Sequence, residues 1–182
     1  MPQLILIGSR GAGKTSVGAA LAARLGTTFV DLDDRAIALG GGGSIRELIA
    51  REGEAAWRGL ERWAFVDAMQ GPSVPAILAL GGGAVTVAEI RDGLVRLRAA
   101  GSVRVVWLRA PVATLIERLR ADPGDRGSLT GRGLLEELPA LLAAREPLYS
   151  GLSNLAVDTG GRTVAEVTDE LLAWLAAPQP LS

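Results

Sequence analysis

Short apolar runs alternate along the chain with longer segments in which apolar residues recur every three or four positions. Such runs are typical of strands in a parallel sheet, where helices cover both faces. The runs occupy residues 4–7, 28–32, 75–80, 103–108 and 155–158. The helical pattern occupies residues 14–25, 44–52, 54–69, 87–99, 111–120, 134–144 and 164–175.

Local signals predict where several of these helices begin or end. Ser44-Ile-Arg-Glu47 has the spacing of a capping box, so a helix is expected to begin there. Pro111 suits a first helical turn. Pro139 predicts a break or restart within the segment 134–144, because proline donates no backbone hydrogen bond.

Strands that alternate with helices predict a three-layer α/β/α fold around a five-stranded parallel sheet. No internal repeat or linker divides the chain. We therefore expect one domain over residues 1–177, followed by a tail at 178–182. Parallel sheets bind their ligands at the carboxyl ends of the strands, and the unusual residues of this chain follow its apolar runs.

Composition narrows the chemistry that the chain can perform. It has no cysteine and no histidine, which excludes a disulfide framework, a cysteine nucleophile, a Ser-His-Asp triad and a thiolate or imidazole metal site. A net charge of −1 gives no electrostatic footprint for nucleic acid or an acidic membrane. No signal peptide or membrane-spanning run is evident, so a cytoplasmic protein is expected.

One lysine stands out in this arginine-rich chain. Of the 19 basic residues only Lys14 is a lysine, which indicates a site where a guanidinium does not substitute. It lies in Gly8-Ser-Arg-Gly-Ala-Gly-Lys14-Thr15, between a predicted strand and a predicted helix, and matches G-x-x-x-x-G-K-[ST]. Backbone N–H groups of such a loop cradle phosphates. We expect Lys14 to reach the β- and γ-phosphates and Thr15 to ligate Mg²⁺. A glycine-rich turn without a ligand is the less favoured interpretation.

Acidic residues end the second predicted strand, at Asp31, Asp33 and Asp34. Strand alternation predicts that Asp31 and Asp33 point to the same side. One of them can serve Mg²⁺ through water, and the other can hold an acceptor hydroxyl. Helix N-capping by Asp33 or Asp34 is the alternative interpretation.

Arg58 and Glu61 are i, i+3 neighbours that can pair, with Arg58 then free to grip a carboxylate. A solvated surface pair is the plainer expectation. Gly81-Gly82-Gly83 ends the third strand and either admits a ligand close to the backbone or forms a plain turn. Arg145 is either a helix-end charge or a second carboxylate clamp.

The loop at residues 121–133 is rich in glycine and carries Arg126. Closure of such a loop over phosphates would exclude water and deliver a positive charge. A disordered surface loop is an equally good interpretation of its composition.

Together these pieces resemble the shikimate kinase family. The matching segments, in the family's order, are GSRGAGKTS, VDLDD, GEAAWRGLE, LALGGGAV, the arginine-bearing loop, AREPLY and the late VDT. The resemblance extends from Leu4 to about Trp174. It implies a nucleoside-monophosphate-kinase-like fold with a helical substrate-binding segment at about 33–61 and a lid at about 121–133. It also implies a monomer that uses ATP and Mg²⁺ to phosphorylate the 3-hydroxyl of shikimate, in aromatic amino-acid biosynthesis.

The same resemblance implies roles for individual residues. Catalysis is implied for Lys14, Asp33 and Arg126. ATP binding is implied for Gly11, Ala12, Gly13, Lys14, Thr15, Ser16, Arg118, Arg126 and Arg162. Substrate binding is implied for Asp33, Trp57, Arg58, Gly81, Gly82, Gly83 and Arg145, with Glu61 behind Arg58. The metal is implied to bind Thr15 and Asp31.

The chain departs from the family at one point. The family lid usually has proline after its arginine, whereas Gly127 follows Arg126 here, so ordering the lid costs more entropy. Arg132 is the fallback for the lid cation. Two other functions stay open: a P-loop kinase for another small acceptor, such as gluconate or a nucleotide, and a catalytically inactive ATP-binding regulatory module.

Overall fold

A computed structural model describes residues 3–70, 74–122 and 134–177. Its sheet has five parallel strands in the order β2-β3-β1-β4-β5. The strands are β1 (Gln3–Ile7), β2 (Phe29–Asp31), β3 (Ile77–Ala79), β4 (Val103–Arg109) and β5 (Leu155–Asp158). The predicted α/β fold with five parallel strands is confirmed.

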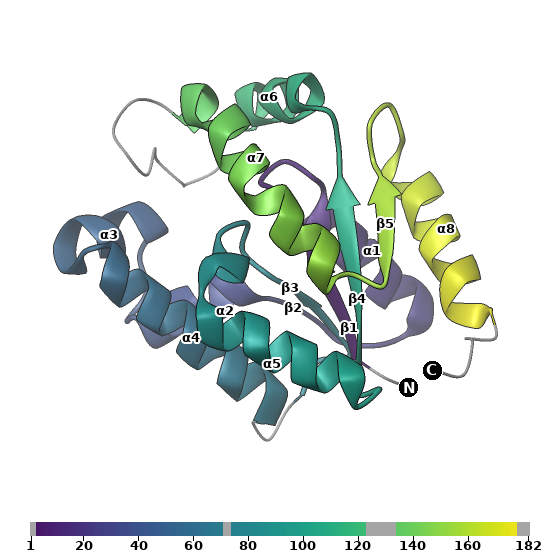
Figure 1. Cartoon of the computed structure of the whole chain (residues 1–182), viewed down its shortest axis with the longest axis horizontal. Coiled ribbons are helices and arrows are strands. Elements are labelled where there is room, and N and C mark those ends of the chain that lie inside the picture. Colours follow the sequence, from purple (N-terminus) through teal and green to yellow (C-terminus); the bar gives the residue numbers. More distant parts are fainter. Residues whose placement is uncertain (1–2, 71–73, 123–133, 178–182) are drawn as a thin grey trace.

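Helices lie on both sides of this sheet (Figure 1). They are α1 (Lys14–Leu25), α2 (Leu32–Leu39), α3 (Ile45–Glu52), α4 (Glu54–Gln70), α5 (Ala88–Ala99), α6 (Val112–Ala121), α7 (Leu134–Leu152) and α8 (Val164–Ala176), with a short 3₁₀ turn η1 (Ala84–Thr86). In Figure 1, α5 and α7 lie in front of the sheet, and α1 lies behind it and packs against α8. Helices α2, α3 and α4 pack together on the left of the view.

The central strands are apolar on both faces because both faces are covered. Residues 4–7 of β1 are buried, as are all three residues of β3. From β1 the chain runs to the edge strand β2, returns to β3 between them, and then crosses to β4 on the other side of β1. The carboxyl ends of β1, β3 and β2 are therefore neighbours, and the loops that follow them meet at one edge of the sheet.

The structure corrects the sequence expectation in two elements. Helix α2 was not predicted: the strand ends at Asp31 and a helix begins at Leu32. The break at Pro139 is also absent, since α7 continues through Pro139 and Pro147. Both prolines are exposed, so the carbonyl oxygens that they leave without an N–H partner lie on the side of the helix nearer to solvent.

Of the sequence signals for the helices, the capping box is confirmed. The Ser44 hydroxyl accepts from the Glu47 N–H, and the Glu47 carboxylate accepts from the Ser44 N–H, which completes the predicted capping box of α3. Pro111, expected in the first turn of its helix, instead lies one residue earlier, as the N-cap of α6. Of the loop expected at 121–133, the part from 123 onward lies outside the described residues, as do Arg126, Gly127, Arg132 and the tail at 178–182.

Candidate functional site

The loop after β1 has the conformation that its glycines permit. Gly11 and Gly13 adopt positive φ values of 75° and 89°, and α1 begins directly afterwards at Lys14. A Cβ atom on Gly8 would overlap the Leu108 carbonyl oxygen, so only glycine fits between the loop and β4. The Lys14 ammonium is buried and donates to the carbonyl oxygens of Gly8 and Ser9, at 3.0 and 2.9 Å. The backbone of the loop therefore holds the charged end of Lys14 in place.

Asp31 connects this loop to the end of β2. Its Oδ2 accepts a hydrogen bond of 2.7 Å from the Thr15 hydroxyl, and its Oδ1 accepts from the Asp33 N–H at 3.0 Å. Asp31 is therefore the N-cap of α2, whereas the sequence suggested Asp33 or Asp34 for capping. The expectation from strand alternation is wrong, because Asp33 already belongs to the helix. Thr15 and Asp31 nevertheless present two neighbouring oxygen ligands beside the loop.

Asp33 is a buried carboxylate at the sheet edge, with 2% of its surface exposed. It lies in the first turn of α2 and faces Gly81, which follows β3. A Cβ atom on Gly81 would overlap the Asp33 carboxylate. Because Gly81 has no side chain, there is space for the Asp33 carboxylate at this position.

Arg58 and Glu61 form a tight pair within α4 rather than the solvated pair that the sequence favoured. Arg58 Nη1 donates to Glu61 Oε2 at 2.6 Å, and only 2% of the Glu61 side chain is exposed. Arg58 Nη2 donates to Glu54 at 2.9 Å. Burial of Arg58 works to lower its pKa, but the charges and hydrogen bonds of Glu61 and Glu54 outweigh it and raise the pKa above the ordinary value. The guanidinium is held in one orientation.

Helix α7 contacts the carboxyl-terminal edge of the sheet at Gly82. The Tyr149 hydroxyl donates to the Gly82 carbonyl oxygen at 2.6 Å, and Arg145 Nη1 donates to it at 3.3 Å. Arg145 and Tyr149 share a face of α7 because they are four residues apart. Burial raises the pKa of Tyr149 to about 12, although the neighbouring Arg145 charge works in the opposite direction. The phenol is therefore a neutral hydrogen-bond donor at physiological pH.

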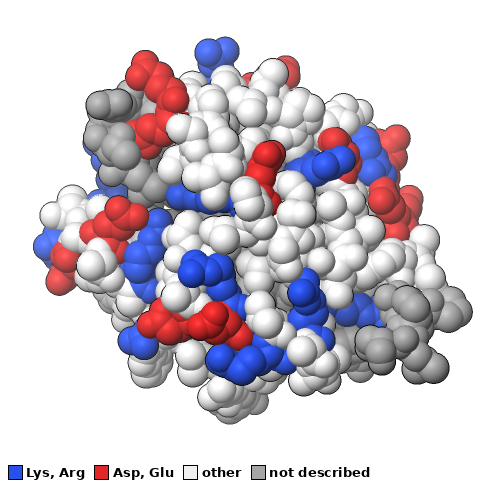
Figure 2. Space-filling model, viewed as in Figure 1, with Lys and Arg blue, Asp and Glu red and all other residues white. Residues whose placement is uncertain are grey.

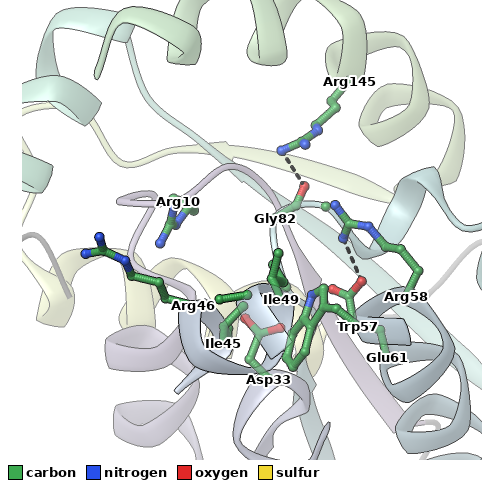
Figure 3. A pocket seen from close by; sticks show the side chains of 13 residues that line it. Arg10, Asp33, Ile45, Arg46, Ile49, Trp57, Arg58, Glu61, Gly82 and Arg145 are labelled. Atoms are coloured by element: carbon green, nitrogen blue, oxygen red, sulfur yellow. Dashed lines mark hydrogen bonds and ion pairs between the residues drawn. The ribbon is translucent and has the colours of Figure 1, made fainter. Parts of the chain in front are cut away.

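Two pockets open at this edge of the sheet. The smaller one, about 220 Å³, is drawn in Figure 3. Its lining joins residues expected from the sequence to others that were not: Arg10, Asp33, Ile45, Arg46, Ile49, Ala50, Trp57, Arg58, Glu61, Gly81, Gly82, Gly83 and Arg145. In the figure, Arg58 and Arg145 lie on one side of the pocket and Arg10 and Arg46 on the other. A small anionic molecule fits such a lining.

The larger pocket, about 760 Å³, surrounds the loop after β1. All the expected ATP-binding residues from Gly11 to Ser16 line it, together with Arg118 and Arg162. Arg118 donates to the Gly11 carbonyl at 3.1 Å and to the Thr159 carbonyl at 2.6 Å, which ties α6 to the loop. Arg162 is anchored by Glu170 at 2.6 Å. The size of this pocket suits a nucleotide better than the smaller pocket does.

Sequence reasoning missed the contributions of Arg10, Arg46 and Tyr149. Tyr149 was not found because its helix was expected to end near Ala144, although its spacing from Arg145 was a usable signal. Arg10 was regarded only as a variable position of the glycine-rich loop. Arg46 gave no signal beyond its position in the first turn of α3.

The surface agrees with a site for a small anion. In Figure 2, acidic and basic side chains are scattered over a visible face that is mostly uncharged, and several basic ones lie at the hollow on the left. Among residues 3–70, 74–122 and 134–177, no group of three or more acidic side chains is arranged to hold a metal ion. Within the same ranges no helix combines the length and apolar character that a membrane crossing requires.

Comparisons with known proteins agree on one family. The family model described as shikimate kinase matches residues 10–176. A shikimate kinase of Synechococcus sp. (strain RCC307) is 37% identical over 176 residues, which cover 94% of this chain and 83% of the relative. A shikimate kinase 2 of Sodalis glossinidius is 40% identical over 157 residues, 85% of each chain. The solved shikimate kinase from Acinetobacter baumannii in complex with shikimate superposes with a TM-score of 0.84 at 31% identity, covering 96% of this chain and 93% of that one.

Proposed function

The chain belongs to the shikimate kinase family, as its sequence motifs indicated, and from that premise we propose that it transfers the γ-phosphoryl group of ATP to the 3-hydroxyl of shikimate. The observation that carries the proposal is a small pocket with paired arginines and a buried carboxylate, opening directly beside a nucleotide-sized pocket. We further propose that it acts as a monomer in the cytoplasm.

Arg58 and Arg145 bind the carboxylate of shikimate. Both guanidiniums line the smaller pocket, and Arg58 is preorganised by the 2.6 Å contact to Glu61. A planar fork fixed in this way can meet a carboxylate with two hydrogen bonds and little loss of side-chain entropy. Trp57, which is 3% exposed, supplies an apolar wall for the ring of the substrate.

Asp33, which lines the smaller pocket, receives the acceptor hydroxyl. Its carboxylate accepts the hydrogen bond of the hydroxyl and takes the proton as transfer proceeds. The hydroxyl oxygen forms a bond to the γ-phosphorus, and the bond from that phosphorus to the bridging oxygen breaks, with its electron pair leaving on ADP. Phosphoryl transfer of this kind depends mainly on positioning and charge stabilisation, which a site without histidine or cysteine can supply.

Thr15 and Asp31 hold Mg²⁺. Their oxygen atoms lie 2.7 Å apart beside the glycine-rich loop at residues 8–15, here called the P-loop, and hard oxygen ligands suit this ion. Mg²⁺ commonly takes one or two protein oxygens and completes its shell with water and phosphates, which agrees with the lack of a larger acidic cluster among the described residues. When bound, the ion neutralises part of the phosphate charge.

The nucleotide occupies the larger pocket. Backbone N–H groups from Gly11 to Ser16 surround its phosphates, and Lys14 contributes the fixed cation. Arg118 lies at the wall of this pocket and flanks the base, with Arg162 as a further candidate there. Arg126 remains the proposed lid cation and lies outside the described residues.

Charge discrimination at the carboxylate tests the proposal. The wild type is expected to use shikimate at least about 10²-fold better than its neutral primary amide, measured as kcat/KM. Arg58→Ala should raise the KM for shikimate and remove most of this preference, whereas Arg62→Ala should leave both unchanged. Arg62 is a matched control, because it lies on the same helix, is half exposed and points away from the pocket toward Glu89.

Arg58→Ala also strips the buried Glu61 of a partner, which can destabilise the fold. The double variant Arg58→Ala/Glu61→Ala removes both charges and keeps the comparison valid. Equal use of shikimate and its amide by the folded wild type would contradict the carboxylate assignment.

A further inference from the structure

Arg10 lies where the two pockets meet. Among the described residues, only Arg10 and Ile45 line both the smaller pocket and the larger one, and Arg10 is the charged member of that pair. Lys14 lines the nucleotide pocket alone, and Arg58 and Arg145 line the substrate pocket alone. A group that passes from one pocket to the other therefore passes Arg10.

The stem of Arg10 lies next to Gly82, in the triple glycine (Gly81 to Gly83) that forms the substrate edge of the sheet. A Cβ atom on Gly82 would lie 3.2 Å from the Arg10 backbone nitrogen and 3.5 Å from its Cγ. The Gly82 carbonyl is in turn held by Tyr149 and Arg145. The loop that carries Arg10 and the triple glycine of the substrate pocket are therefore packed side by side at Gly82.

The smaller pocket has more arginines than the proposed carboxylate clamp uses. Four arginines and two carboxylates line it, and Arg58 is already paired with Glu61 and Glu54. Shikimate carries one carboxylate, whereas its phosphate ester carries almost two further negative charges. Arg10 and Arg46 lie across the pocket from the proposed carboxylate clamp (Figure 3). Arg10 and Arg46 are thus the two arginines of this pocket that the clamp does not use, and of these two only Arg10 also lines the nucleotide pocket.

We propose that Arg10 holds the phosphoryl group as it crosses between the pockets and then binds the phosphate of the product. This inference rests on the proposed function. As the acceptor oxygen bonds to the γ-phosphorus and the electron pair of the breaking bond passes to ADP, Arg10 donates hydrogen bonds to the equatorial oxygens of the transferring group. Its contact with unphosphorylated shikimate is weaker, so its binding energy is available mainly in the transition state and the product complex.

The test compares Arg10→Met with Arg46→Met, which removes an equal charge from the same pocket but not from its boundary with the nucleotide pocket. For Arg10→Met we expect kcat to fall about 10²-fold, the usual effect of losing one transition-state donor. We expect its KM for shikimate to change less than about threefold. Binding of shikimate 3-phosphate, measured by calorimetry without ATP, should weaken at least tenfold relative to wild type. The fold decrease in kcat caused by Arg46→Met should be at least tenfold smaller than the decrease caused by Arg10→Met.

The outcomes separate this inference from the proposed function. A folded Arg10→Met with wild-type kcat and product affinity would overturn the inference, as would equal losses in both variants, which would reflect the general field of the pocket. A raised KM for shikimate with unchanged kcat would assign Arg10 to the carboxylate instead. If Arg10→Met does not fold, Arg10→Lys keeps the charge without the fork and is expected to fall between wild type and about 10²-fold loss of kcat. A wild type that does not phosphorylate shikimate would refute the proposed function itself, and this inference with it.

Discussion

Tyr149→Phe removes one hydroxyl from the junction between α7 and the substrate edge. Tyr149 is fully buried, its ring stacks on Trp107 with a 5.8 Å centroid separation, and its hydroxyl donates to Gly82 at 2.6 Å. The variant keeps the ring and loses the hydrogen bond. Among the described residues, the Gly82 carbonyl oxygen then keeps only the longer side-chain hydrogen bond of 3.3 Å from Arg145, so we expect the free energy of unfolding at neutral pH to fall by about 1–2 kcal/mol.

The same hydroxyl makes stability depend on pH in the alkaline range. Burial raises the pKa of Tyr149 to about 12, compared with about 10 in the unfolded chain. The folded state therefore keeps the proton more tightly, and its contribution is complete below about pH 10 and is lost as the pH rises through about 12. The two-unit difference corresponds to about 2.7 kcal/mol. The wild type should lose this amount over that range, whereas the phenylalanine variant should not.

Urea unfolding across this pH range measures the effect. The stability curves of the two proteins should cross near about pH 11, because the wild type begins higher and falls further. Every other titratable group is the same in both proteins, so the difference between the curves isolates the tyrosine. The chain has one tyrosine, so tyrosinate absorbance of the folded protein reports this residue directly. Parallel curves, or a tyrosinate transition near about pH 10 in the folded protein, would refute the reasoning.

Three further results are expected. Gly81→Ala should lower kcat/KM about 10²-fold in steady-state assays, since its Cβ would displace the Asp33 carboxylate. Gly59→Ala is the control and should match the wild type, because its Cβ would have no neighbour within 4 Å. Arg118→Ala should raise the KM for ATP more than the KM for shikimate, because its guanidinium ties the nucleotide pocket to Thr159; an equal rise in both would contradict this. Chelation of Mg²⁺ should abolish turnover reversibly, and Thr15→Ala should increase the Mg²⁺ concentration needed for half-maximal rate; an unchanged requirement would remove Thr15 from the metal site.

The fold could be predicted from the sequence wherever burial imposes a pattern. The predicted run at 155–158 coincides with β5, and the run at 4–7 differs from β1 by one residue at its start. The predicted helix at 14–25 coincides with α1. Helix α2 escaped prediction because the apolar run at 28–32 extends past Asp31 to Leu32, which is the first residue of the helix. The hydrogen bond from the Asp33 N–H to Asp31 Oδ1, which caps the helix, marks the change from strand to helix.

The candidate site was foreseeable as a set of residues but not as an arrangement. The glycine-rich loop and the triple glycine identify the edge of the sheet, because parallel strands place their carboxyl ends together. The burial of Glu61 beside Arg58 depends on how α4 packs, which no local spacing encodes. The position of Arg10 between the two pockets depends on the strand order. In the sheet β3 lies directly beside β1, although β2 separates them in the sequence.

The most direct test of the central claim is a coupled measurement of ADP release with a panel of acceptors. The wild-type protein with Mg²⁺ and ATP is assayed with shikimate, gluconate and nucleoside monophosphates at equal concentrations. Release that is stimulated by shikimate and not by the other acceptors, with formation of shikimate 3-phosphate, is the predicted result. Stimulation by gluconate or a nucleotide instead, or by none of the acceptors, would contradict the assignment.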